Sequence, residues 1–135
     1  MASVIVGYVP APEGAAALAH ARREAALFED RLVIVNVRTT GRGLGHGHGG
    51  EDAGDELDAI TAELEAAGSD FVLIHPEGDY DPAEEILSAA ALNNGRLIVV
   101  GLRHRTPVGK LILGSTAQRV LLEAPCPVLC VKAGQ

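Results

Sequence analysis

The run Leu32-Val33-Ile34-Val35-Asn36-Val37 contains one polar residue, and its β-branched side chains follow one another without alternation. An antiparallel strand with one wet face alternates polar and apolar residues, whereas a parallel strand buried on both faces reads as a continuous apolar run. Four other stretches have the same character, at residues 4–8, 71–74, 97–100 and 127–131. The sequence therefore predicts five buried parallel strands.

Helical patterns fill the four intervals between these runs. The expected helices extend from Gly14 to Asp30, from Glu51 to Ala67, from Asp81 to Asn93 and from Gly114 to Ala124. In the third, Asp81 can cap the first turn, and Pro125 stops the fourth. Because strand and helix alternate throughout, we expect one α/β domain over residues 1–135, with right-handed crossovers. Its centre would be a doubly wound, Rossmann-like five-stranded parallel sheet with helices on both faces.

The composition argues against several classes of partner. The 135 residues include 18 acidic and 11 basic side chains, and the net charge of −7 disfavours a DNA-groove binder or a polybasic membrane anchor. Aromatic residues make up 3% with no Trp, which weakens base stacking on single-stranded nucleic acid. No apolar run approaches the roughly 20 residues that span a bilayer, and no secretory signal is evident. We expect a cytoplasmic protein without nucleic acid or membrane partners.

The glycine-rich segment 38–50 falls outside the alternation, and we expect a flexible loop there. His46 and His48 within it could ligate Zn²⁺ or Ni²⁺. A structural zinc centre takes four rigidly held ligands, and this loop supplies two of them. We therefore expect no metal ligands in this protein, and the loop would bind metal ions weakly at most.

The final strand has the features of a sheet edge. Pro127 lacks an N–H group, which suits an edge position, and Pro127–Val131 would leave an apolar edge able to pair with another chain. Antiparallel pairing about a two-fold axis buries that edge, so we expect a homodimer through this strand. Cys126 and Cys130 would lie on one face of the strand about 13 Å apart, too far to form a disulfide with each other.

The segment after the fourth strand carries the clearest binding pattern. Ligands of open parallel sheets usually sit beyond the carboxyl ends of the strands. Here Gly101 is followed by a basic loop with Arg103, Arg105 and Lys110, and Gly114-Ser115-Thr116 then opens a helix. The free N–H groups and the positive dipole end of that helix would bind phosphate oxygens, although Gly-Ser is also an ordinary helix N-cap.

The pattern Gly101-x2-His104-x9-Gly114-Ser115 and the segment 124–131, with its Cys126-Pro127-Val128, resemble the C-terminal signature of the universal stress protein (UspA-like) family. The resemblance covers essentially the whole chain. It implies an adenine nucleotide alpha hydrolase-like sheet and a dimer through the last strand. In one branch of the family it also implies an adenine nucleotide, ATP or AMP, held between the ends of the first and fourth strands, which Mg²⁺ could accompany.

Carried over by position, the resemblance implies six binding residues: Val37, Gly101, His104, Gly114, Ser115 and Thr116. Val37 falls where the family contacts adenine through its backbone, and Thr116 adds an amide to the phosphate cradle. His104 stands where the motif has its second glycine. Val9 stands where the family has an acid that contacts the nucleoside, and Glu13 could replace that acid only if the loop folds back.

The motifs predict binding rather than chemistry. The sequence shows no positioned general base, no Walker lysine motif and no carboxylate pair for Mg²⁺ near the expected phosphate end, all of which phosphoryl transfer normally uses. We therefore expect no catalytic residues and a stress-response module that binds nucleotide with little or no hydrolysis, a weak ATPase at most. The alternative is a dimeric interaction module that binds no nucleotide and acts through the acidic second helix or the glycine-rich loop.

Overall fold

The computed structural model describes residues 1–37, 48–105 and 110–133, with side chains described over 1–37, 56–103 and 113–133. Its elements are β1 (Ser3–Tyr8), α1 (Pro12–Phe28), β2 (Arg31–Asn36), α2 (His48–Ala66), β3 (Phe71–Ile74), α3 (Pro82–Leu92), β4 (Gly95–Arg105), β5 (Lys110–Ile112), α4 (Ser115–Glu123) and β6 (Val128–Lys132).

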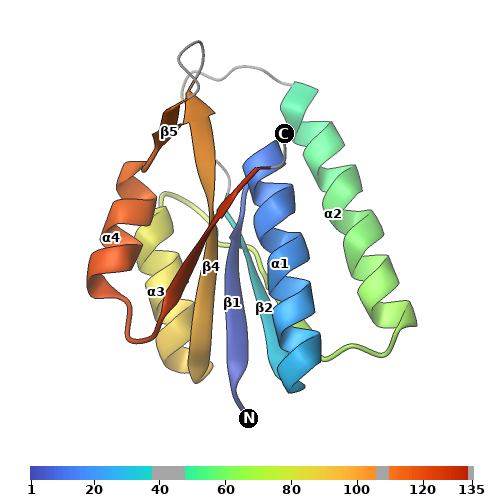
Figure 1. The fold of residues 1–135 in the computed structure, drawn as a ribbon. Coiled ribbons are helices and arrows are strands. Elements are labelled where there is room, and N and C mark those ends of the chain that lie inside the picture. Colours follow the sequence, from blue (N-terminus) through green and yellow to red (C-terminus); the bar gives the residue numbers. More distant parts are fainter. Residues whose placement is uncertain (38–47, 106–109, 134–135) are drawn as a thin grey trace.

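Five of the strands form one parallel sheet in the order β3-β2-β1-β4-β6 (Figure 1). β1 lies in the middle, paired with β2 on one side and with β4 on the other. The chain winds outward from β1 through β2 to β3, then crosses over to β4 and β6. The predicted doubly wound five-stranded parallel sheet is confirmed, and the winding direction switches between β1 and β4.

Helices cover both faces of the sheet, as predicted. Val4, Val6 and Tyr8 of β1 pack in a core with α1 and α2, whereas Ile5 packs in a second core with α3 and α4. These four side chains are at most 1% exposed. Because side chains alternate between the two faces and both faces are covered, every position of the strand is apolar or small.

The predicted basic loop after Val100 is wrong in its first part, because β4 continues to Arg105. Beyond the parallel sheet, β4 pairs in antiparallel fashion with β5, with Arg103 opposite Ile112. A strand that outruns its neighbours leaves backbone N–H and C=O groups without partners, and β5 supplies them. The segment that precedes α4 is therefore a hairpin arm, whose tip at residues 106–109 lies outside the described part of the chain.

Two helices start earlier than their patterns predict. α1 begins at Pro12 instead of Gly14, because proline suits the first helical turn. α2 begins at His48 instead of Glu51, so the last three residues of the expected loop 38–50 are helical. The rest of that loop, including His46, lies outside the described residues. Among the described helices, none combines the length and the apolar character that crossing a membrane requires.

α2 is attached to the end of β1 by a polar contact. The Tyr8 hydroxyl donates a hydrogen bond to Glu56 Oε1 at 2.9 Å, while its ring is buried under α2. Burial raises the pKa of the Tyr8 phenol above its ordinary value, and the hydrogen bond to Glu56 raises it further. The folded protein therefore favours the protonated phenol.

This contact predicts a loss of stability at alkaline pH. Since the pKa of Tyr8 is higher in the folded than in the unfolded protein, its contribution is complete below the unfolded pKa near 10 and falls above it. We expect Tyr8 alone to lower the free energy of unfolding by about 1.4 kcal/mol per pH unit above that value. In Tyr8→Phe, urea denaturation should give a shallower decline between about pH 9 and 11.

Equal slopes for wild type and Tyr8→Phe would show that the phenol titrates without cost in the folded state.

Candidate functional site

A cavity of about 360 Å³ lies where β1, β2 and β4 end and where α1, α3 and α4 begin. It is lined by Gly7, Val9, Pro10, Ala11, Glu13, Val37, Pro82, Ile86, Val100, Gly101, Arg103, Gly114, Ser115, Thr116 and Ala117. The cavity lies at the switch in winding direction, the position where open α/β sheets usually hold ligands. Its volume falls within the roughly 300–1,000 Å³ of small-molecule sites.

Five of the six predicted binding residues line this cavity: Val37, Gly101, Gly114, Ser115 and Thr116. The sixth, His104, has its backbone in β4, and its side chain lies outside the described part of the structure. The Val37 N–H donates to the carbonyl oxygen of Tyr8 at 2.8 Å. Its carbonyl oxygen is therefore the backbone group that it can offer to a base.

The start of α4 offers hydrogen-bond donors to the cavity. The N-cap is Gly114, which has no side chain to cap the helix. The first N–H that bonds within the helix is that of Gln118, to the Gly114 carbonyl oxygen at 2.9 Å. Ser115, Thr116 and Ala117 line the cavity, and as the first three residues of the helix they have no intrahelical acceptor. Such a helix end suits an anion.

Glycine occupies the two positions of the predicted motif for different physical reasons. A Cβ at Gly101 would overlap the carbonyl oxygen of Glu13 and lie 2.7 Å from its carbonyl carbon. Gly101 therefore lets α1 pack directly on the end of β4. Among the described residues, a Cβ at Gly114 would meet only Nη2 of Arg103, at 3.7 Å. Gly114 has open space beside it, into which a ligand can come close to the backbone.

The first turn of α1 forms one wall of the cavity. Gly14 packs so closely on β1 that a Cβ there would overlap the carbonyl oxygen of Val9, and that oxygen also accepts the Ala11 N–H at 2.8 Å. The chain folds back after β1 in this way, and Glu13 borders the cavity beside Val9. The loop therefore folds back, as the replacement of an acid at position 9 by Glu13 requires, and the backbone of Glu13 lies beside Val9.

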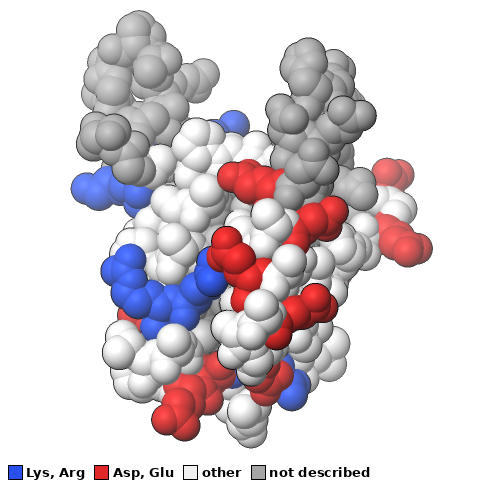
Figure 2. All heavy atoms as spheres, turned by 90° about the vertical axis from the view of Figure 1, so that its right-hand side faces the viewer, with Lys and Arg blue, Asp and Glu red and all other residues white. Residues whose placement is uncertain are grey.

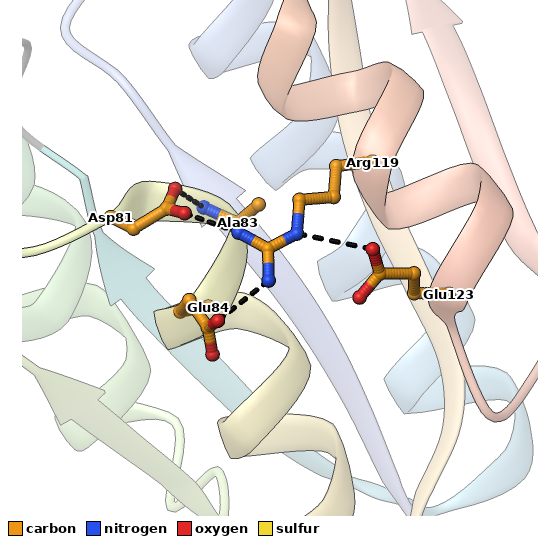
Figure 3. A network of polar contacts seen from close by, with 5 residues as sticks. All are labelled: Asp81, Ala83, Glu84, Arg119 and Glu123. Carbon is orange, nitrogen blue, oxygen red and sulfur yellow. Dashed lines mark hydrogen bonds and ion pairs between the residues drawn. The ribbon is translucent and has the colours of Figure 1, made fainter.

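Arg119, in the middle of α4, holds this helix against the start of α3 (Figure 3). Its guanidinium donates to Asp81, to Glu84 Oε2 at 2.6 Å and to Glu123 Oε2 at 3.2 Å. Hydrogen bonds to Glu84 and then to Glu123 raise the pKa of Arg119 above its ordinary value. Asp81 also accepts the Ala83 N–H at 3.1 Å and so caps α3. The first turn of α3, which borders the cavity, is thus tied to the middle of α4.

His75, Cys126 and Cys130 lie apart from the cavity lining. His75 is exposed, and its Nδ1 lies 3.1 Å from Nδ2 of Asn36, a contact between the ends of β3 and β2. Cys126 precedes β6 and Cys130 lies within it. Both are free and pack toward the α3 and α4 core, and burial raises the pKa of both thiols. Within the described stretches, no group of three or more His, Cys, Asp or Glu side chains could hold a metal ion.

Sequence reasoning missed the contribution of α3 to the cavity. Pro82 and Ile86 line it from the first turns of that helix. The capping pattern at Asp81 correctly predicted where α3 begins. A helix that starts just after a parallel strand begins at the same edge of the sheet, so the pattern contained the signal for this wall as well.

Comparisons with known proteins agree with this architecture. The model of the universal stress protein family matches residues 1–132. A universal stress protein of Mycolicibacterium smegmatis is 40% identical over 129 residues, which are 96% of each protein. A universal stress protein structure from Archaeoglobus fulgidus is 27% identical with a TM-score of 0.71, over 98% of both chains. A structure from Archaeoglobus fulgidus in complex with dAMP is 23% identical with a TM-score of 0.68, again over 98% of both. The chain therefore belongs to the universal stress protein family.

Proposed function

We propose that the cavity binds an adenine nucleotide, ATP or AMP, as part of a stress-response module. The observation that carries the proposal is the cavity of about 360 Å³ at the sheet switch point, into which the uncapped start of α4 opens beside Gly114. Apolar side chains of Val9, Val37 and Ile86 offer surface for a flat base, and the α4 amides offer donors for a phosphate.

The position of this cavity supports the adenine assignment through the family resemblance, since residues that match the family's nucleotide motif line it. The Archaeoglobus fulgidus complex with dAMP has the same fold, and at 23% identity it supports the fold rather than the ligand.

The proposed location of the protein is the cytoplasm, which is in line with its two free, half-buried thiols.

The proposal is one of binding with little or no hydrolysis. Phosphoryl transfer normally uses a Mg²⁺ ion that is bound jointly by protein carboxylates and the substrate phosphates. It also uses a group that positions the nucleophile. Glu13 is the one carboxylate in the described lining of the cavity. It lies in the first turn of α1.

Gly114→Val tests the site. The backbone at Gly114 has φ −68° and ψ 168°, which valine adopts, and the Cβ position is open, so we expect the variant to fold. Its side chain would fill the approach to the α4 amides. Isothermal titration calorimetry with ATP and with AMP should show affinity at least about 10-fold weaker than wild type, because charge-assisted hydrogen bonds are lost.

Gly101→Ala is the matched control, and the expectation for folding is opposite: this variant should lose stability. Its methyl group would displace the first turn of α1, so we expect a loss of about 1–3 kcal/mol in the free energy of unfolding. A folded Gly114→Val protein with wild-type nucleotide affinity would place the phosphate elsewhere.

The second candidate function is an interaction module that binds no nucleotide, and the exposed acidic face of α2 favours it. Figure 2 shows acidic side chains gathered along this helix, among them Glu56, Asp58, Glu63 and Glu65. A basic partner would complement that face. Absence of nucleotide binding by the wild-type protein up to millimolar concentrations would favour this function.

We also propose a homodimer through the segment Pro127–Val131. β6 pairs with β4 along one side, and among the described residues no strand covers its other side. Val128, Leu129 and Cys130 are half-buried. An exposed edge with apolar side chains is a template for pairing, and a two-fold axis lets two such edges pair with each other.

Sedimentation at micromolar concentration should give a dimer of about 28 kDa, twice the 14.0 kDa chain. β3 serves as an internal control, since it pairs only with β2 and forms the other edge of the sheet. In hydrogen exchange, the outward amides of β6 should exchange more slowly than those of β3, because only β6 is paired. A monomer with equally fast exchange at both edges would contradict the dimer.

A further inference from the structure

Arg103 differs from most of the arginines that the structure describes. Arg22, Arg31, Arg96 and Arg119 each pair with at least one carboxylate. Arg103 makes no ion pair or hydrogen bond with any described residue, although the protein carries a net charge of −7 and an excess of acids. Within the described part of the chain, its positive charge therefore has no partner.

The Arg103 side chain also lies at the cavity. It belongs to the part of β4 that outruns the parallel sheet, and it is one of the lining residues. Its Nη2 lies 3.7 Å from the position of a Cβ on Gly114, which puts the guanidinium beside the open start of α4. A phosphate next to Gly114 would thus meet the guanidinium and the α4 amides together. Guanidinium groups bind phosphate oxygens with two parallel N–H groups.

The charges of the lining set how many phosphates the cavity can neutralise. Arg103 is the one cationic side chain among the described lining residues, and Glu13 is the one carboxylate. Mg²⁺ sites that hold nucleoside triphosphates use protein carboxylates together with several phosphate oxygens. In the described part of the lining, one guanidinium and one helix start match a single phosphate group, and the volume of about 360 Å³ is near the lower end for small-molecule sites.

We propose that Arg103 is the phosphate-binding side chain of this cavity and that it selects a nucleoside monophosphate bound without a metal ion. This inference rests on the proposed function, because the cavity and the adenine ligand are those proposed above. It adds the residue that binds the phosphate, the number of phosphates and the independence from Mg²⁺.

The test is calorimetric titration of the full chain with adenosine, AMP and ATP, each with EDTA and with Mg²⁺. We expect AMP to bind equally well under both conditions and ATP to bind no more tightly than AMP. Arg103→Gln should weaken AMP about 10- to 100-fold, the value of a charge-assisted hydrogen bond pair, and leave the affinity for adenosine unchanged. Arg103→Lys should recover part of the loss, since lysine keeps the charge without the planar fork.

Arg23→Gln is the matched control. Arg23 is also exposed and without an ion pair among the described residues, but it lines a separate cavity near the C-terminal half of α1. The variant has the same net charge as Arg103→Gln and should bind AMP as wild type does. If both variants weaken AMP equally, net charge and not the position of Arg103 is responsible, and the proposal is wrong.

Two further outcomes overturn the inference while the proposed function stands: wild-type AMP affinity in a folded Arg103→Gln protein, and Mg-ATP that binds at least 10-fold more tightly than AMP. Ribose 5-phosphate separates the two proposals. If it binds and needs Arg103 while adenosine and AMP do not bind, the phosphate role stands and the adenine ligand falls. If none of these compounds binds, both proposals fall.

Discussion

The direct contact between the first turn of α1 and the carboxyl ends of β1 and β4 is the constraint on which the arrangement depends. At Gly14 and Gly101 no side chain separates helix from strand, and a single methyl group at either position would overlap a backbone carbonyl. Protein interiors are packed too densely to absorb such an overlap without moving an element. The Ala17, Ala21 and Ala25 side chains extend the same close fit along the buried face of α1.

This contact and the Arg119 cluster have complementary roles around the cavity. The glycine contacts fix the α1 wall against the sheet, and Arg119 ties the middle of α4 to the start of α3 through Asp81 and Glu84 (Figure 3). Between these two walls, the start of α4 keeps its backbone amides without side-chain caps. Close packing therefore fixes the α1 wall of the cavity, whereas ion pairs outside its lining fix α3 against α4.

The sequence was sufficient to predict the sheet, because burial on both faces leaves continuous apolar runs that few other structures produce. It also predicted α3, since a proline follows an aspartate that caps. The β4–β5 hairpin was not predictable in this way. β5 has three residues, and its strand conformation depends on pairing with a β4 edge that extends past its neighbours. For the site, the motif led to Gly101 and Gly114 alike. Only the structure distinguishes a glycine that lets a helix pack on a strand from one with open space beside it.

The central place of β1 has a consequence for how the chain folds as it is made. β1 is synthesised before the other strands of this sheet, and it can pair with β2 as soon as β2 has emerged at Asn36. Its other edge is completed by β4, where Val4 pairs with Leu97, and Ser3 donates to the carbonyl oxygen of Asn93, 90 residues away. Pairings so distant in sequence form late and slowly, because a long loop must close first. During synthesis one edge of β1 therefore stays open until more than two-thirds of the chain exists, which is the stage at which the nascent protein most needs protection from aggregation.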